Sequence, residues 1–168
     1  CQWAKHLGAT VIGTVGSDEK AALAKAHGCD HAIVYSREDF TARVKEITDG
    51  KGVPVVYDSV GKDTFMGSLD CLQPRGLMVS FGNASGPPGP LNVLALSQKG
   101  SLFLTRPTLG HYTPNHAAVL KVANDLFDVV SSGAVKIEIN QTYPLQDAAQ
   151  AHRDLESRKT TGSTVLNI

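Results

Sequence analysis

Short β-branched runs alternate with amphipathic stretches along this chain, and that alternation constrains the fold more than any other feature. The β-branched runs predict strands at residues 10–15, 31–35, 53–57, 76–81 and 101–105, with a last short strand at Val165-Leu166. The amphipathic spacing predicts helices at residues 1–7, 19–27, 39–47, 64–72, 117–132 and 146–158. Strands that alternate with helices need crossover connections, so we expect an α/β fold with a mostly parallel sheet.

Composition excludes several classes of partner and compartment. Among 168 residues, 16 Lys and Arg balance 16 Asp and Glu, which argues against a nucleic-acid partner or a polybasic membrane surface. No apolar run approaches the ~18 residues of a membrane span. Cys1, Cys29 and Cys71 lie too far apart for a disulfide framework or a zinc-ligand motif, so a cytoplasmic protein is expected.

The glycine fingerprint of a dinucleotide-binding fold, G-x-G-x-x-G between a strand and a helix, is absent from this sequence. The opening helix at 1–7 nevertheless resembles the helix that follows such a fingerprint. Residues 10–15 would then form the second strand of a Rossmann-type, doubly wound sheet with helices on both faces. In the order 3-2-1-4-5-6 the absent first strand is central, so two neighbouring strands lose a partner and the segment is expected to fold poorly alone, unless another segment takes that place.

Open parallel sheets bind ligands at the carboxyl ends of their strands. After residues 10–15 come Gly16, Ser17 and Lys20, a small, hydroxyl-bearing and cationic set that suits the 2′-phosphate of NADP better than the bare ribose of NAD. Tyr35, at the next strand end, is expected to donate a hydrogen bond or to cover the adenine. Asp18 and Glu19 oppose a phosphate here, unless they cap the following helix and point away.

Several segments closely resemble the zinc-independent, zeta-crystallin-like quinone oxidoreductases of the medium-chain dehydrogenase/reductase superfamily. They are VIGTVGS at 11–17, VVYDSVG at 55–61, GLMVSFGN at 76–83, LTRP at 104–107 and AHRDLESR at 151–158, followed by Thr161-Gly162. The resemblance covers essentially the whole chain, in order and with similar spacings.

This resemblance implies that residues 1–168 are a dinucleotide-binding domain that binds NADP(H). About the last 15 residues would return toward an N-terminal GroES-like substrate domain that this sequence does not contain. It places Gly16, Ser17 and Lys20 at the ribose phosphate, and Tyr35 at the adenine side. The remaining contacts that it implies are Phe81, Gly82 and Asn83 beside the nicotinamide, Arg158 near the phosphates and, less directly, Arg106, Pro107 and Thr108.

The implied reaction is hydride transfer from NADPH to a quinone, with no catalytic side chain and no metal in this segment, which alone is expected to be inactive. An enoyl or alkenal reductase and a non-catalytic NADPH-binding module remain as alternatives. None of the six histidines stands at ligand spacing from a cysteine or carboxylate, so surface or core roles are expected for them. Residues 101–105 would be an edge strand, which predicts a homodimer paired through it.

Overall fold

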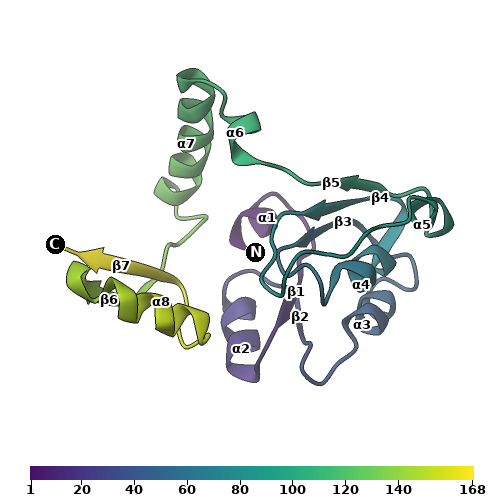
Figure 1. Cartoon of the computed structure of the whole chain (residues 1–168), viewed down its shortest axis with the longest axis horizontal. Helices are drawn as coiled ribbons and strands as arrows, with labels where there is room; N and C mark the ends of the chain where they lie inside the picture. The colour runs from purple at the N-terminus through teal and green to yellow at the C-terminus, as the bar shows by residue number, and fades with distance from the viewer. The chain divides into compact units, whose positions relative to one another are not determined.

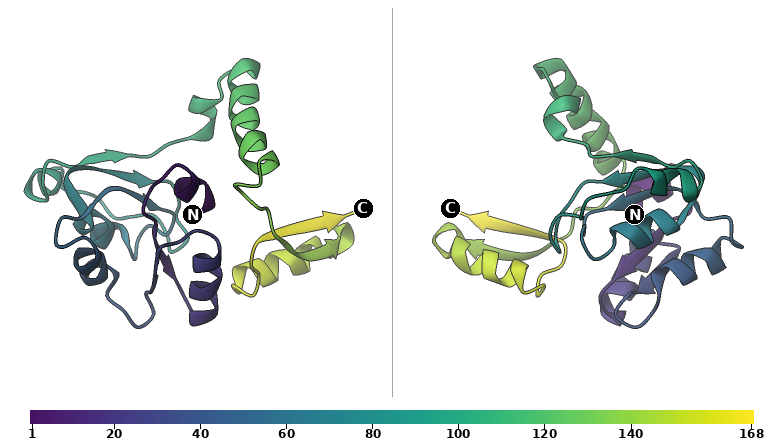
Figure 2. Two further views of the ribbon diagram at one scale, coloured as in Figure 1. Left: turned by 180° about the vertical axis from the view of Figure 1, so that it is seen from behind. Right: turned by 45° about the vertical axis from the view of Figure 1, so that its right-hand side comes forward.

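The computed structural model describes all 168 residues, which divide into two compact units (Figures 1 and 2). The first unit comprises Cys1 and residues 3–122, and the second comprises Gln2 and residues 123–168. Every strand pair in both units is parallel, which confirms the predicted α/β alternation. None of the helices combines the length and the apolar character needed to cross a bilayer.

The first unit begins with a short helix and a strand–helix–strand motif. The elements are α1 (Gln2–His6), β1 (Ile12–Val15), α2 (Asp18–Ala26) and β2 (His31–Val34). The β1–β2 register runs from Ile12 opposite His31 to Val15 opposite Val34, so both strands end at the same edge. Residues that follow Val15 and Val34 are therefore neighbours, as expected for a parallel pair.

A three-stranded parallel sheet in the order β3-β4-β5 completes the strands of the first unit. Its elements are β3 (Val53–Asp58), α4 (Phe65–Asp70), β4 (Leu72–Ser80), α5 (Leu94–Gln98) and β5 (Phe103–Thr105). Asp58 lies opposite Ser80, and Thr105 lies opposite Val79, so these strands also end together. β5 pairs with β4 alone and is therefore an edge strand, as predicted.

Helix α3 (Phe40–Ile47) packs in a hydrophobic cluster that joins the two sheets of this unit. Its Val44 is buried with Ile33 of β2 and with Cys71, and partly buried side chains of β1 and β3 pack against them. A second cluster lies around α4 and β4. Its buried members are Phe65, Leu69, Leu72, Met78 and Leu102.

The strand neighbours agree with the Rossmann order, apart from one open place. β1 pairs only with β2, and β3 pairs only with β4, so the facing edges of β1 and β3 have no strand between them. No other segment of residues 1–168 lies in the place that the first strand would take. The alternative that another segment replaces this strand is therefore excluded.

The second unit contains a strand pair that the sequence pattern only half predicted. β6 (Ile139–Pro144) and β7 (Ser163–Asn167) pair in parallel, joined by a 3₁₀ turn (Leu145–Asp147) and α8 (Ala148–Glu156). α8 packs against β6 (Figure 2). We predicted β7 but not β6, because the polar sequence INQTYP lacks the apolar run that identifies a buried strand.

Other boundaries differ from the prediction for local reasons. Two short helices, α5 and α6 (Leu109–Tyr112), were not predicted, since four or five residues show no helical period. β4 begins at Leu72, earlier than predicted, because Leu72 pairs with Val53 of β3. The register between the two strands shifts after this pair. Regular pairing starts at Leu77, one residue after the predicted start. α7 (His116–Ser131) agrees with its prediction within one residue at each end.

Candidate functional site

The end of β1 leads directly into the first turn of α2, and Ser17 caps that helix. The Ser17 Oγ accepts a hydrogen bond from the backbone N–H of Lys20 at 3.3 Å. Serine is favoured at this position because its oxygen satisfies a helix N–H that has no partner within the helix. The cap holds Ser17 and Lys20 on one turn of backbone.

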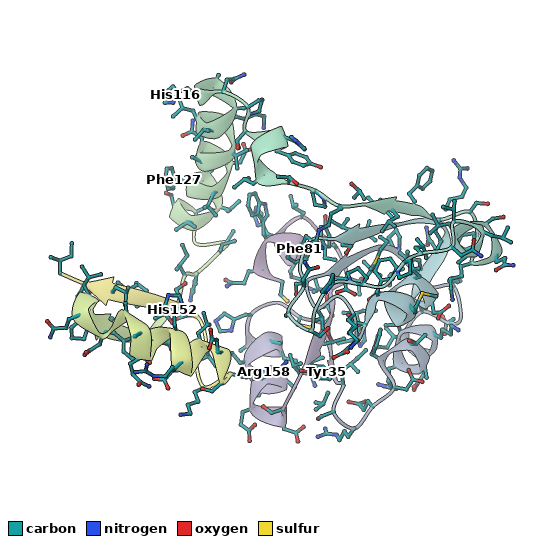
Figure 3. The ribbon with its side chains drawn as sticks, viewed as in Figure 1. Tyr35, Phe81, His116, Phe127, His152 and Arg158 are labelled. Carbon is teal, nitrogen blue, oxygen red and sulfur yellow. The ribbon has the colours of Figure 1, made fainter.

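The end of β2 lies against the end of β1. A Cβ built on Gly16 would stand 3.3 Å from the Tyr35 hydroxyl, so the phenol lies directly over this glycine. The Ser36 Oγ donates a hydrogen bond to the Gly16 carbonyl at 3.3 Å. Tyr35, labelled in Figure 3, keeps 45% of its surface exposed, which leaves its ring accessible to a ligand. The structure thus brings together Gly16, Ser17, Lys20 and Tyr35.

The two acidic residues of this turn both have partners. Arg37 makes two hydrogen bonds of 2.7 Å to the two carboxylate oxygens of Asp18, and this interaction lowers the pKa of Asp18. The pKa of Glu19 is also lowered, chiefly by a hydrogen bond from the Ser17 hydroxyl. Ser17 caps the helix, and both acids lie in its first turn, where carboxylates are favoured. The partnership with Arg37 was not predicted.

Asp58, the last residue of β3, organises a second group of residues. Its carboxylate accepts hydrogen bonds from the backbone N–H groups of Val60 (2.8 Å) and Gly61 (2.9 Å). It also accepts bonds of 2.7 Å from the hydroxyls of Thr64 and Ser68. Burial alone would raise the pKa of Asp58, but these four donors outweigh it and the pKa is lowered. A carboxylate with four donors is a stable buried anion.

The residues after β4 are held against the same carboxyl end. The N–H groups of Phe81 and Gly82 donate to the carbonyl of Asp58 at 2.9 and 3.3 Å. A Cβ added at Gly82 would overlap the backbone of Ser59, so only glycine permits this approach. Phe81 remains half exposed beside the packed turn.

Arg106, directly after β5, joins the second group through hydrogen bonds to residues at the end of β4. Its guanidinium donates to the Gly82 carbonyl at 3.1 Å and to the Ser80 hydroxyl at 3.3 Å. An open pocket of about 360 Å³ lies beside it. The pocket is lined by Phe65, Ser80, Asn83, Pro87, Pro88, Gly89, Leu91, Leu104 and Arg106. Phe81, Gly82, Asn83 and Arg106 are therefore brought to one place.

Three predicted residues are not part of either group. Pro107 and Thr108 follow Arg106 but do not line the pocket, and Thr108 makes no side-chain cap for α6. Arg158 belongs to the second unit, where it follows α8 with a positive φ of 60° (Figure 3).

The sequence prediction missed the pairing of Arg37 with Asp18 and the role of Asp58. A signal for Asp58 was available: Thr64 and Ser68 are four residues apart in a predicted helix, so both hydroxyls face the preceding strand end. Nothing comparable marks Arg37, because its partner lies 19 positions away in the sequence.

No other group in the chain suggests metal or nucleophilic chemistry. No three His, Cys, Asp or Glu side chains come close enough together to hold a metal ion. His116 on α7 and His152 on α8 are exposed (Figure 3). Burial raises the pKa of the Cys71 thiol to about 11, which makes it a poor nucleophile.

Comparison with known proteins gives a consistent set of relatives. A family model described as zinc-binding dehydrogenase matches residues 1–124. A quinone oxidoreductase of Pseudomonas aeruginosa is 58% identical over 166 residues, which are 99% of this chain and 51% of that protein. A 2-haloacrylate reductase of a Burkholderia species is 52% identical over 165 residues, 98% of this chain and 50% of that protein.

Solved structures of quinone oxidoreductases agree with these sequence relatives. The structure of Escherichia coli quinone oxidoreductase complexed with NADPH superposes with a TM-score of 0.95 at 52% identity, over 99% of this chain and 52% of that one. The Rossmann-type fold class is thereby confirmed. The chain spans about half the length of the relatives that it matches. Zinc appears in the family description, but this chain offers no set of ligands for it, and we assign no step to a metal.

Replacing Asp58 by Asn should destabilise the first unit. The amide keeps one acceptor oxygen and places an NH₂ against donors, so we expect the free energy of unfolding at pH 7 to fall by about 1–3 kcal/mol, measured by urea denaturation. Because the native pKa is lowered, the contribution of the carboxylate is complete above its ordinary value of 3.8 and disappears as the pH falls below it. The difference between the two proteins should therefore narrow in acid.

The matched control is Asp63→Asn, an exposed carboxylate in the same turn, which should change stability by less than about 0.5 kcal/mol. Equal effects of the two substitutions would contradict the role given to Asp58.

Proposed function

The chain belongs to the zinc-binding dehydrogenase family, and on that premise we propose that it is the NADPH-binding half of a quinone oxidoreductase of the medium-chain dehydrogenase/reductase superfamily. The observation that carries the proposal is the group at the ends of β1 and β2, where Gly16, Ser17, Lys20 and Tyr35 meet. An enzyme that uses NAD places an unpaired acid at this position to bind the ribose hydroxyls. Here both nearby acids are partnered.

In this proposal the first group holds the adenosine end of NADPH. The Ser17 hydroxyl, which donates to Glu19, would exchange that acceptor for an oxygen of the 2′-phosphate. The Lys20 ammonium would offset the phosphate charge. The phenol of Tyr35, over Gly16, would donate to the same phosphate or cover the adenine ring.

The second group would hold the nicotinamide end. Phe81, Gly82 and Asn83 would flank the ring, with Arg106 fixing the turn through the Gly82 carbonyl. NADPH, when bound, supplies the hydride that reduces the quinone. The residues of this chain orient the ring and exclude water, and none of them acts as an acid or base. Arg158 is proposed for the cofactor phosphates, and Pro107 and Thr108 for peripheral contacts.

Replacing Lys20 by Ala should weaken NADPH binding about tenfold, because a charge-assisted hydrogen bond to the phosphate is lost. NADH, which has no 2′-phosphate, should bind with a Kd changed by less than about twofold. Fluorescence titration of the full-length protein with both cofactors measures this. Lys25→Ala, in the last turn of the same helix, is the control and should leave both constants unchanged. Parallel losses for the two cofactors would refute the role of Lys20.

A second activity is favoured by one observation. A 2-haloacrylate reductase is nearly as similar to this chain as the quinone oxidoreductases, so reduction of an activated double bond uses a closely similar cofactor half. NADPH oxidation by the full-length protein should be followed with quinones and with enones. Faster turnover of quinones supports our proposal, faster turnover of enones supports an enoyl or alkenal reductase, and binding without turnover supports a non-catalytic module.

We propose that the whole protein also carries a substrate domain and the first strand of this sheet. The relatives are about twice as long, and the facing edges of β1 and β3 lack a strand. Residues 1–168 would be inactive without that half, and their last residues would return toward it. The proposed location is the cytoplasm, where three free thiols persist in the reduced form.

We propose a homodimer that forms through β5. Phe103 and Leu104 are exposed on this edge strand, and an apolar edge with free backbone groups favours pairing with a second copy. Sedimentation of the full-length protein should give a dimer, and Phe103→Lys should shift it toward the monomer. A wild-type protein that sediments as a monomer would refute this arrangement.

A further inference from the structure

The ends of β1 and β2 contact each other at three successive positions. Tyr35 lies over Gly16, the Ser36 hydroxyl bonds to the Gly16 carbonyl, and Arg37 bonds to Asp18. Only the third contact joins opposite charges. Its geometry is bidentate, with both Arg37 Nη atoms 2.7 Å from separate Asp18 oxygens. Such a pair fixes the direction of the carboxylate as well as its charge.

Asp18 stands where an acid would decide between the two nicotinamide cofactors. It follows Ser17 directly and lies two residues before Lys20, at the carboxyl end of the strand where a ribose is bound in this type of fold. An unpaired carboxylate here would accept hydrogen bonds from a 2′-hydroxyl and would repel a 2′-phosphate. The sequence alone therefore contains an acid that favours NADH, beside a lysine that favours NADPH.

The other carboxylates near Arg37, those of Glu38 and Glu19, are engaged with different partners and leave Arg37 to Asp18. Glu38, the adjacent acid, accepts a hydrogen bond from the Val34 N–H at 2.9 Å and pairs with Arg43 at 3.3 Å. Glu19 is engaged with Ser17. Asp18 is thus the carboxylate that Arg37 neutralises, and both side chains are more than half exposed, so neither is needed for core packing.

We propose that Arg37 is a specificity-determining residue that selects NADPH over NADH by holding and neutralising the Asp18 carboxylate. The inference rests on the proposed function, since it concerns the same cofactor. Arg37 acts through Asp18 and needs no contact with the phosphate. The Asp18–Arg37 pair is neutral as a unit, so the charges that remain in this turn are the Lys20 ammonium and the Glu19 carboxylate, and the ammonium attracts the phosphate without opposition from Asp18.

Two single substitutions should move cofactor preference in opposite directions. Arg37→Met leaves Asp18 unpaired, so NADPH should bind about twofold to fivefold more weakly while NADH binds more tightly. Asp18→Asn releases the guanidinium, so NADPH should bind more tightly by a similar factor without a gain for NADH. The double substitution removes both charges and should return the preference to that of the wild type.

The experiment is a titration of the full-length protein and these three variants with NADPH and with NADH, followed by nucleotide fluorescence. Arg153→Met is the matched control, because the Arg153 guanidinium bonds to Gln150 on its own helix α8 and the substitution should leave both constants unchanged. Measurements at low salt and at about 1 M salt, where the Debye length is only about 3 Å, add a second readout. The differences between variants should shrink in high salt.

The outcomes separate this inference from the function on which it rests. If the wild type prefers NADPH and the two single variants shift in opposite directions, the proposal is supported. If the wild type prefers NADPH but Arg37→Met behaves like Arg153→Met, the role of Arg37 is refuted and the proposed function stands. If both single variants weaken both cofactors, the pair is merely structural and the proposal fails. A wild type that binds no NADPH overturns the proposed function and this inference together.

Discussion

The buried carboxylate of Asp58 is the interaction on which the second half of the site depends. Four donors from the turn and helix after β3 converge on it, and the carbonyl of the same residue receives the N–H groups of Phe81 and Gly82 after β4. One residue thereby fixes two adjacent strand ends. Removing its charge would leave buried donors without a partner, which is more costly than losing an exposed bond. Arg106 then binds the Gly82 carbonyl in the turn after β4, which the bonds to Asp58 already hold in place.

Charge at the other end of the site is arranged on the surface. Lys20, Asp18 and Arg37 are held by a helix cap and an ion pair, and not by burial. This difference suits the proposed function, because a cofactor phosphate needs a cation that solvent can reach before binding. The buried network fixes the shape of one end, whereas in our proposal the exposed pair would set the local charge that a cofactor meets at the other.

The sequence predicted the parts of the structure that follow from periodicity. Buried parallel strands need apolar runs and packed helices need an apolar face, so β1 to β5 and the longer helices were recognisable. Gly16, Ser17, Lys20 and Tyr35 lie together as expected, because parallel strands end at one edge, and their contacts with a cofactor stay a prediction. The Arg37–Asp18 pair was not predictable, since it depends on the register of two strands that no local pattern encodes. β6 was missed because its side chains are mostly polar or exposed.

Within residues 1–168, β4 is the one strand with a partner on each side, whereas β1 and β2 form a ribbon of two strands. A two-stranded pair is marginally stable by its own hydrogen bonds, and regions with fewer partners open at lower free energy. In residues 1–168 alone the two ends of the site should therefore differ in rigidity, with the turn at Phe81 better ordered than the ends of β1 and β2. The strand that we propose between β1 and β3 would remove this difference, because β1 would then have a partner on each side. Ordering the adenosine end of the site is thus a task of the proposed first strand, which need not contact the cofactor to serve it.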